Sequence, residues 1–166
     1  MPINKKKLKC NHAYIDAANL DKGTARLGWR VDYRKLYTWL YDKFDIKRAY
    51  IFMGYMPQYD RLYDKIRNAG FLLKYKEVTA GSNGQIKGNC DSDLVLRASR
   101  DVYESVFDKA ILVSSDGDFS GLVKYFAEIG KMSSVVSPNS KCSVLLMNTG
   151  AKITYLNDVR DFVRLD

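Results

Sequence analysis

The alternation of apolar and polar positions predicts strands and helices in turn along most of the chain. The clearest unit begins with the short apolar run Ala110–Val113, typical of a buried strand, which is followed by a polar turn at Ser114–Gly117. Apolar residues then recur at helical spacing, at positions Phe119, Leu122, Val123 and Phe126. We therefore expect a strand, a tight turn and a helix in succession.

The ends of this helix are marked by Asp118, at the expected N-cap, and by Gly130, at the expected C-terminal stop. The stretch 132–136 has the pattern of the next strand. A strand, helix and strand in this order form a βαβ unit with parallel strands and a right-handed crossover. The turn after the first strand then lies at the carboxyl end of the sheet, where open α/β proteins place their chemistry.

The remaining segments follow the same order. We expect further strands at residues 13–15, 49–53, 71–78 and 153–156, the third of them near an edge of the sheet. We expect helices after the cap Asp32, over 60–69, from Asp91 through a face of Leu94, Ala98, Val102 and Val106, and over 144–147. Residues 21–31 are expected to form a loop and 79–89 a hairpin or flap. The predicted fold is α/β, with a doubly wound, mainly parallel sheet of five to six strands.

The length of 166 residues suits one domain, which we place at 10–166 after a basic, flexible arm at 1–9. The chain has three widely spaced cysteines and no CxxC or Cys/His pattern, which argues against a disulfide framework and against a zinc site. A reducing cytoplasm is the expected location. No apolar segment long enough for a signal peptide or a membrane span is apparent.

The net charge of the chain indicates which class of partner it binds. Lys and Arg number 27 against 19 Asp and Glu, a formal net charge of +8, which favours a polyanion such as nucleic acid. Several acids are collected in short motifs, so the rest of the surface is more basic than the total suggests. Among twelve tyrosines, Tyr55 and Tyr59 could stack a base, or could simply pack against the neighbouring helix.

Aspartates stand where strands end and helices begin. Asp16 ends the first strand, Asp91 and Asp93 open a helix, and Asp116 lies in the turn after the fourth strand. Each could merely cap a turn or a helix. If the first and fourth strands are neighbours, however, these carboxylates converge and need a cation to remain ionised together. Oxygen ligands without His or Cys select Mg²⁺ or Mn²⁺, and such a site suits phosphodiester cleavage.

The whole set resembles a known family. From His12 to Val136 the chain is similar to an NYN domain, the LabA-like branch of the PIN-like nuclease superfamily. Three motifs in order carry the resemblance, Ile15–Leu20, Lys87–Leu94 and Leu112–Phe119, with Leu122, Val123, Gly130 and Lys131 behind the last of them. The resemblance implies a PIN-like, Rossmann-like three-layer sandwich with strand order 3-2-1-4-5 and a metal-dependent ribonuclease activity.

The resemblance also implies roles for individual residues. Metal ligands would be Asp16, Asp91 and Asp116, with Asp118 and Asp93 binding directly or through water. Asn19, Ser114 and Ser115 would orient metal or phosphate, and Lys87 would meet the scissile phosphate. Ser115 stands where the family commonly has glycine, and its side chain narrows the approach of substrate to the backbone.

Other functions fit less well. A haloacid dehalogenase needs a second acid at the position of Ala18, a receiver domain needs acids before Asp16, and dinucleotide binding needs a glycine-rich first turn. The alternative that stays open is a non-catalytic module that keeps the acidic pocket but only binds RNA or a protein. The lone His12 is expected to be structural. Single-stranded RNA is the favoured substrate, while DNA and a homodimer remain compatible with the sequence.

Overall fold

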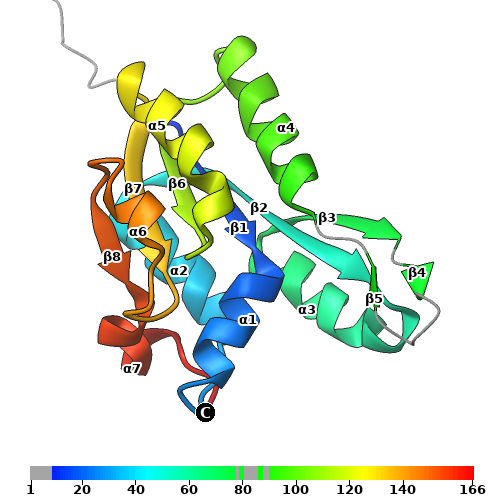
Figure 1. Ribbon diagram of the computed structural model, residues 1–166. Helices are drawn as coiled ribbons and strands as arrows, with labels where there is room; N and C mark the ends of the chain where they lie inside the picture. Colours follow the sequence, from blue (N-terminus) through cyan, green and yellow to red (C-terminus); the bar gives the residue numbers. More distant parts are fainter. Residues whose placement is uncertain (1–8, 78, 81–85, 88–89) are drawn as a thin grey trace, which may run out of the picture.

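A parallel six-stranded sheet forms the centre of the protein in the computed structural model, which describes residues 9–77, 79–80, 86–87 and 90–166 (Figure 1). Its strands are β1 (Asn11–Asp16), β2 (Ile46–Tyr55), β3 (Leu72–Glu77), β6 (Ala110–Val113), β7 (Met132–Ser137) and β8 (Ile153–Tyr155). They lie in the order β3-β2-β1-β6-β7-β8, and each neighbouring pair is parallel. The predicted doubly wound sheet is confirmed, with β8 added beyond the order that the resemblance implies.

Helices cover both faces of the sheet and make three layers. One face carries α1 (Ala17–Ala25), α2 (Tyr33–Phe44), α3 (Asp60–Ala69) and α7 (Arg160–Val163), while the other carries α4 (Asp91–Tyr103), α5 (Ser120–Glu128) and α6 (Val144–Met147). Two buried clusters hold the layers together. Leu36, Leu40 and Ile66 pack with Ile15 on the first face, and Leu94, Ala98, Val123 and Phe126 pack with Leu112 on the second.

Shorter elements complete the described part of the chain. The expected hairpin is present as β4 (Thr79–Ala80) paired with β5 (Ile86–Lys87), and 3-10 turns occur at η1 (Pro57–Tyr59), η2 (Gly117–Phe119) and η3 (Leu156–Val159). The predicted basic arm lies outside the described residues, apart from Lys9, and stays a prediction. Among the helices described, each is too short or too polar to cross a lipid bilayer.

Local chemistry explains several boundaries that the sequence predicts correctly. Helix α2 begins after Asp32, whose carboxylate accepts a hydrogen bond from the Lys35 amide at 3.0 Å. Helix α3 ends at Gly70, which adopts φ +115, a value that strongly favours glycine.

Two predicted boundaries are wrong, and one helix was not predicted. The expected loop at 21–31 begins inside α1, and the interior position of Gly23 has a packing reason, because a Cβ there would collide with Pro138. Helix α4 ends at Tyr103, so Val106 lies beyond the helix and is 38% exposed. Helix α7 follows β8 in a stretch for which no element was predicted, and its Val163 is fully buried.

Candidate metal centre

The carboxyl ends of β1 and β6 lie side by side, because Ile15 pairs with Val113 in the parallel register. The next residues along each strand are therefore neighbours. Ser114 donates a hydrogen bond to Asp16 at 3.4 Å, and the same hydroxyl accepts one from the Asp116 amide at 3.1 Å. This small network ties the first aspartate motif to the third.

Asn19 joins the same two motifs from α1. Its amide carbonyl accepts hydrogen bonds from the backbone N–H of Ser115 at 2.8 Å and from the Ser115 hydroxyl at 3.1 Å. The backbone N–H of Asn19 donates to Asp16 at 3.2 Å, so Asp16 also caps α1. Asn19 thus fixes the turn after β6, and the side chain of Ser115 takes part in that fixation.

The turn after β6 differs from the prediction in one respect. Asp116, not Asp118, is the capping residue, because its carboxylate accepts a hydrogen bond from the Asp118 amide at 2.9 Å. The single 3-10 turn η2 separates this cap from α5, which begins at Ser120. Gly117 lets this turn approach α6 closely, since a Cβ at this position would collide with the Ser143 hydroxyl.

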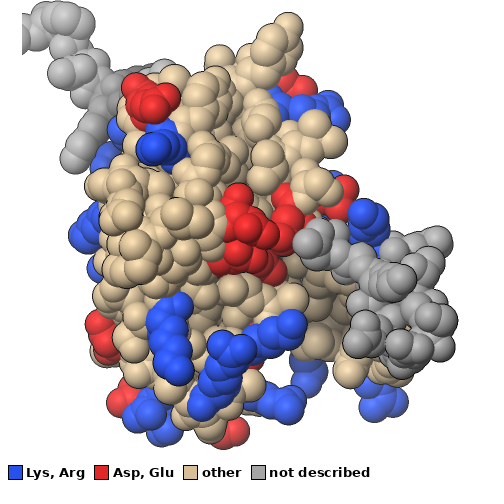
Figure 2. Space-filling view, viewed as in Figure 1, with Lys and Arg blue, Asp and Glu red and all other residues tan. Residues whose placement is uncertain are grey.

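Three carboxylates meet at this edge of the sheet. One oxygen from each of Asp91, Asp116 and Asp118 lies within 4.8 Å of the other two. Asp91 and Asp116 are half-buried and Asp118 is exposed. Figure 2 shows acidic side chains gathered in the middle of this face, with basic side chains around them. An all-oxygen set of this kind suits a hard divalent cation.

Electrostatics in the cluster favours a cation. Burial, together with repulsion from Asp16, Asp116 and Asp118, raises the pKa of Asp91 to about 6. Burial also raises the pKa of Asp16, and the negative charge of Asp116 adds to the effect, although hydrogen bonds from Asn19 and Ser114 oppose it. A bound divalent ion would remove this repulsion.

Not every predicted ligand joins the three-carboxylate group. Asp16 lies close enough to repel Asp91 but is held by Asn19 and Ser114 outside that group. Asp93 is exposed in the first turn of α4 and lines a neighbouring groove with Cys90. The backbone of Lys87 pairs with Thr79 in the β4–β5 hairpin, and its side chain lies outside what the structure describes.

The histidine expected to be structural and the two tyrosines considered for base stacking lie in different surroundings. His12 is buried in β1, with its Nδ1 3.4 Å from Asp101, and burial lowers its pKa. It lies near the amino end of the strand, opposite the acidic cluster. Tyr55 packs against Tyr75 with ring centroids 4.8 Å apart, whereas Tyr59 is 47% exposed.

Two arginines near the site were not predicted from the sequence. Arg97 and Arg100 lie on α4, two turns after Asp91, and line the groove that Asp93 enters. Their spacing could have indicated a basic face on this helix, because residues three apart on a helix share a face.

Comparison with known proteins places this sequence in a family. The sequence profile of the NYN domain matches residues 13–157, most of the chain. The chain belongs to the NYN domain family. The NYN domain is part of the PIN-like nuclease superfamily, and the resemblance inferred from the three motifs is confirmed at this level, while the LabA-like branch stays a prediction.

A solved structure has the same fold as this NYN domain. It is a protein of unknown function, VPA0982 from Vibrio parahaemolyticus RIMD 2210633, with a TM-score of 0.78 and 21% sequence identity. The match covers 97% of this chain and 99% of the other. At this identity the likeness supports the fold alone. None of the functionally curated proteins compared with the chain matches it.

Proposed function

We propose that this NYN domain is a metal-dependent ribonuclease that hydrolyses phosphodiester bonds in single-stranded RNA, cutting within the strand. The observation that carries the proposal is the meeting of Asp91, Asp116 and Asp118, with ligand oxygens within 4.8 Å of one another, in a chain of the NYN family. Clustered carboxylates at the carboxyl edge of a parallel sheet are placed for chemistry at a phosphate.

The residues fit Mg²⁺ or Mn²⁺. Asp91, Asp116 and Asp118 would hold the ion through carboxylate oxygens, and the ion would offset both the burial of Asp91 and the repulsion from its neighbours that raise its pKa. A bound ion of this class lowers the pKa of a coordinated water and stabilises a leaving oxygen. Asp93 would contribute only through water, from its exposed position on α4.

The remaining predicted residues would act around the carboxylates. Asp16 positions Ser114, and through it the Asp116 amide, while adding negative charge beside Asp91. Asn19 and Ser115 hold the turn that presents Asp116. Lys87 would meet the scissile phosphate and stabilise the charge that develops on it.

Cleavage of an end-labelled single-stranded RNA tests the proposal. We expect products with Mn²⁺ or Mg²⁺ and none with chelator, and we expect Asp116→Asn to reduce the rate by at least about a hundredfold. Asp42→Asn removes the same charge from an exposed position on α2 and should cleave like the wild type. RNA that is bound but left intact by the wild type with every metal would instead identify a non-catalytic binding module.

A further inference from the structure

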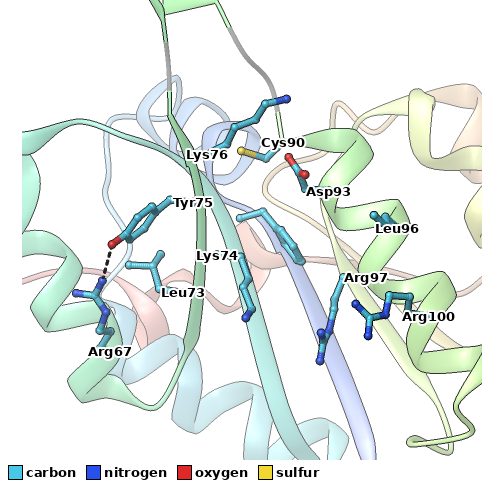
Figure 3. Close-up of a pocket in the computed structure, with 11 residues that line it drawn as sticks. Arg67, Leu73, Lys74, Tyr75, Lys76, Cys90, Asp93, Leu96, Arg97 and Arg100 are labelled. Atoms are coloured by element: carbon cyan, nitrogen blue, oxygen red, sulfur yellow. Dashed lines mark hydrogen bonds between the residues drawn. The ribbon is translucent and has the colours of Figure 1, made fainter.

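A groove adjoins the acidic cluster on the α4 side of the sheet. Its cavity volume is about 520 Å³, and its lining includes Phe52, Lys74, Arg97 and Arg100. Figure 3 shows Lys74 on the strand side and Arg97 and Arg100 reaching in from α4. We call this feature the basic groove.

The basic groove exists because α4 covers only part of its face of the sheet. The helix packs through Leu94 and Ala98 over the central strands, in the cluster that contains Leu112. Strand β3 lies at the edge of the sheet, so Lys74, which pairs with Phe52 of β2, stays exposed. Lysines on an edge strand discourage pairing with another strand, which argues against a protein strand as the occupant.

Buried side chains beneath the groove hold Arg97 in place. Its Nε lies 3.3 Å from Asp101, whose side chain is 1% exposed, and its Nη2 donates to the Tyr50 hydroxyl at 2.9 Å. The guanidinium also lies 4.8 Å from the centre of the Tyr50 ring. Asp101 is fixed in turn by the Tyr14 hydroxyl at 2.7 Å. An arginine ordered in this way loses little conformational entropy when it binds a phosphate.

The charge of the groove matches a polyanion. Five basic side chains line it, and they outnumber Asp93 in the lining and Asp101, which is buried against Arg97. The five are Arg67, Lys74, Lys76, Arg97 and Arg100. Arg100 also contacts Glu104 at 3.3 Å, but an exposed pair of this kind is worth little and yields readily to a phosphate.

The groove leads to the metal centre. Cys90 and Asp93 line its end, and Asp91, one of the three clustered carboxylates, lies between them in the chain. The lining of the groove thus comes within one helical turn of Asp91 on α4. A volume of about 520 Å³ is in the range of sites for small ligands, about 300–1,000 Å³, so the groove can hold a short part of one strand.

We propose that the basic groove binds the phosphate backbone of single-stranded RNA on one side of the cleavage position, through Lys74, Arg97 and Arg100. The choice of RNA rests on the proposed function. Leu96, which is 62% exposed on the wall of the groove, gives the bases an apolar contact.

Binding in chelator tests the groove separately from cleavage. Fluorescence anisotropy with a labelled single-stranded RNA should show that Lys74→Gln/Arg100→Gln weakens affinity about tenfold or more, with the salt slope reduced by about 1.4 for two lost contacts. Lys43→Gln/Lys47→Gln removes the same charge from exposed positions at the end of α2 and the start of β2, and should bind like the wild type. Equal affinity of the two double variants would overturn the proposal, as would a wild type that does not bind RNA.

Photo-crosslinking locates the strand directly. A benzoylphenylalanine at Leu96 should cross-link to the RNA, whereas one at Tyr103, 90% exposed on the same helix but outside the groove lining, should not. Cross-linking at position 96 by a protein that cuts no RNA would retain the groove and reject the nuclease. Cleavage without cross-linking at position 96 would retain the nuclease and reject the groove as the RNA-binding site. Binding of polyglutamate in place of RNA would assign the groove to an acidic protein and reject RNA.

Discussion

Asp91 is half-buried at the start of α4 and experiences the charges of Asp16, Asp116 and Asp118. Its pKa of about 6 lies above the ordinary value of 3.8, so the folded protein binds the proton more tightly than the unfolded chain does. Ionisation of Asp91 therefore lowers stability as the pH rises from about 4 to about 6, and the loss is complete above that range.

We predict that Asp91→Asn, in chelator, raises the free energy of unfolding at pH 7.5 by an amount on the order of 1 kcal/mol, because solvent screens part of the repulsion. The gain should shrink at pH 4.5, where the wild-type carboxyl is largely protonated. Urea denaturation at the two pH values measures the difference. A variant no more stable than the wild type at pH 7.5 would show that the carboxylates do not repel one another as described.

Asn19 provides a second residue whose effect can be measured. Asn19→Ala removes the acceptor of two hydrogen bonds from Ser115, and we expect the free energy of unfolding to fall by about 1 kcal/mol. The cleavage rate should also fall, by about tenfold, because the turn that presents Asp116 is no longer held by Asn19. Denaturation and single-turnover rates separate the two effects, and a rate that follows stability alone would reduce Asn19 to a structural role.

At this scale the sequence predicted that aspartates from separate motifs lie near one another, but it did not predict their individual contacts. Asp116 and Asp118 flank one glycine, and either could cap the following helix. The structure inserts η2 between the cap and α5, which gives the capping role to Asp116. Spacing along the chain did not reveal that turn.

At the scale of elements, the close approach of η2 and α6 supports the metal centre. Ser143 caps α6 by accepting from the Leu145 amide, and its own amide donates to the Ser115 carbonyl at 3.1 Å. Gly117 is required there because any side chain would meet Ser143.

We predict that Gly117→Ala destabilises the fold by about 1–3 kcal/mol, as expected for overpacking. Ser143→Gly alone should also be destabilising, because α6 loses its cap. In the double variant the collision is absent, so thermal denaturation should show less destabilisation than the sum of the two changes. Strict additivity would mean that the two residues do not meet.

Helix α1 shows where reasoning from single elements fails. Gly23 and Gly28 favoured a loop, since glycine weakens a helix interior. Gly23 nevertheless lies inside α1, and a glycine is needed there because Pro138, far away in sequence, packs against it. Helices α2 and α3 needed no such contact, and the apolar period with Asp32 and Gly70 as signals was enough to place them.

The topology of the whole molecule gathers the site. Residues 16, 91 and 116 are distant in sequence. Residues 16 and 116 approach because β1 and β6 are neighbours at the centre of the sheet, and residue 91 joins them because α4 packs over these two strands. The alternation of strands and helices predicted the doubly wound class, and the family resemblance supplied the strand order. The basic groove was not predictable, because it depends on how much of β2 and β3 helix α4 leaves uncovered.

A metal that binds the native cluster should stabilise the entire fold. We predict that Mn²⁺ at about one hundred times its dissociation constant raises the free energy of unfolding of the wild type by about 2.7 kcal/mol. Mn²⁺ should raise the free energy of unfolding of Asp42→Asn by the same amount, and that of Asp116→Asn by far less. Denaturation with and without Mn²⁺ measures these gains, and an equal gain in all three proteins would mean that Mn²⁺ binds elsewhere.

The most direct test of the metal centre is an anomalous-scattering map from crystals soaked in Mn²⁺. We predict a manganese peak ligated by carboxylate oxygens of Asp91, Asp116 and Asp118. Manganese bound at other positions, with no peak at these three carboxylates, would contradict the assignment.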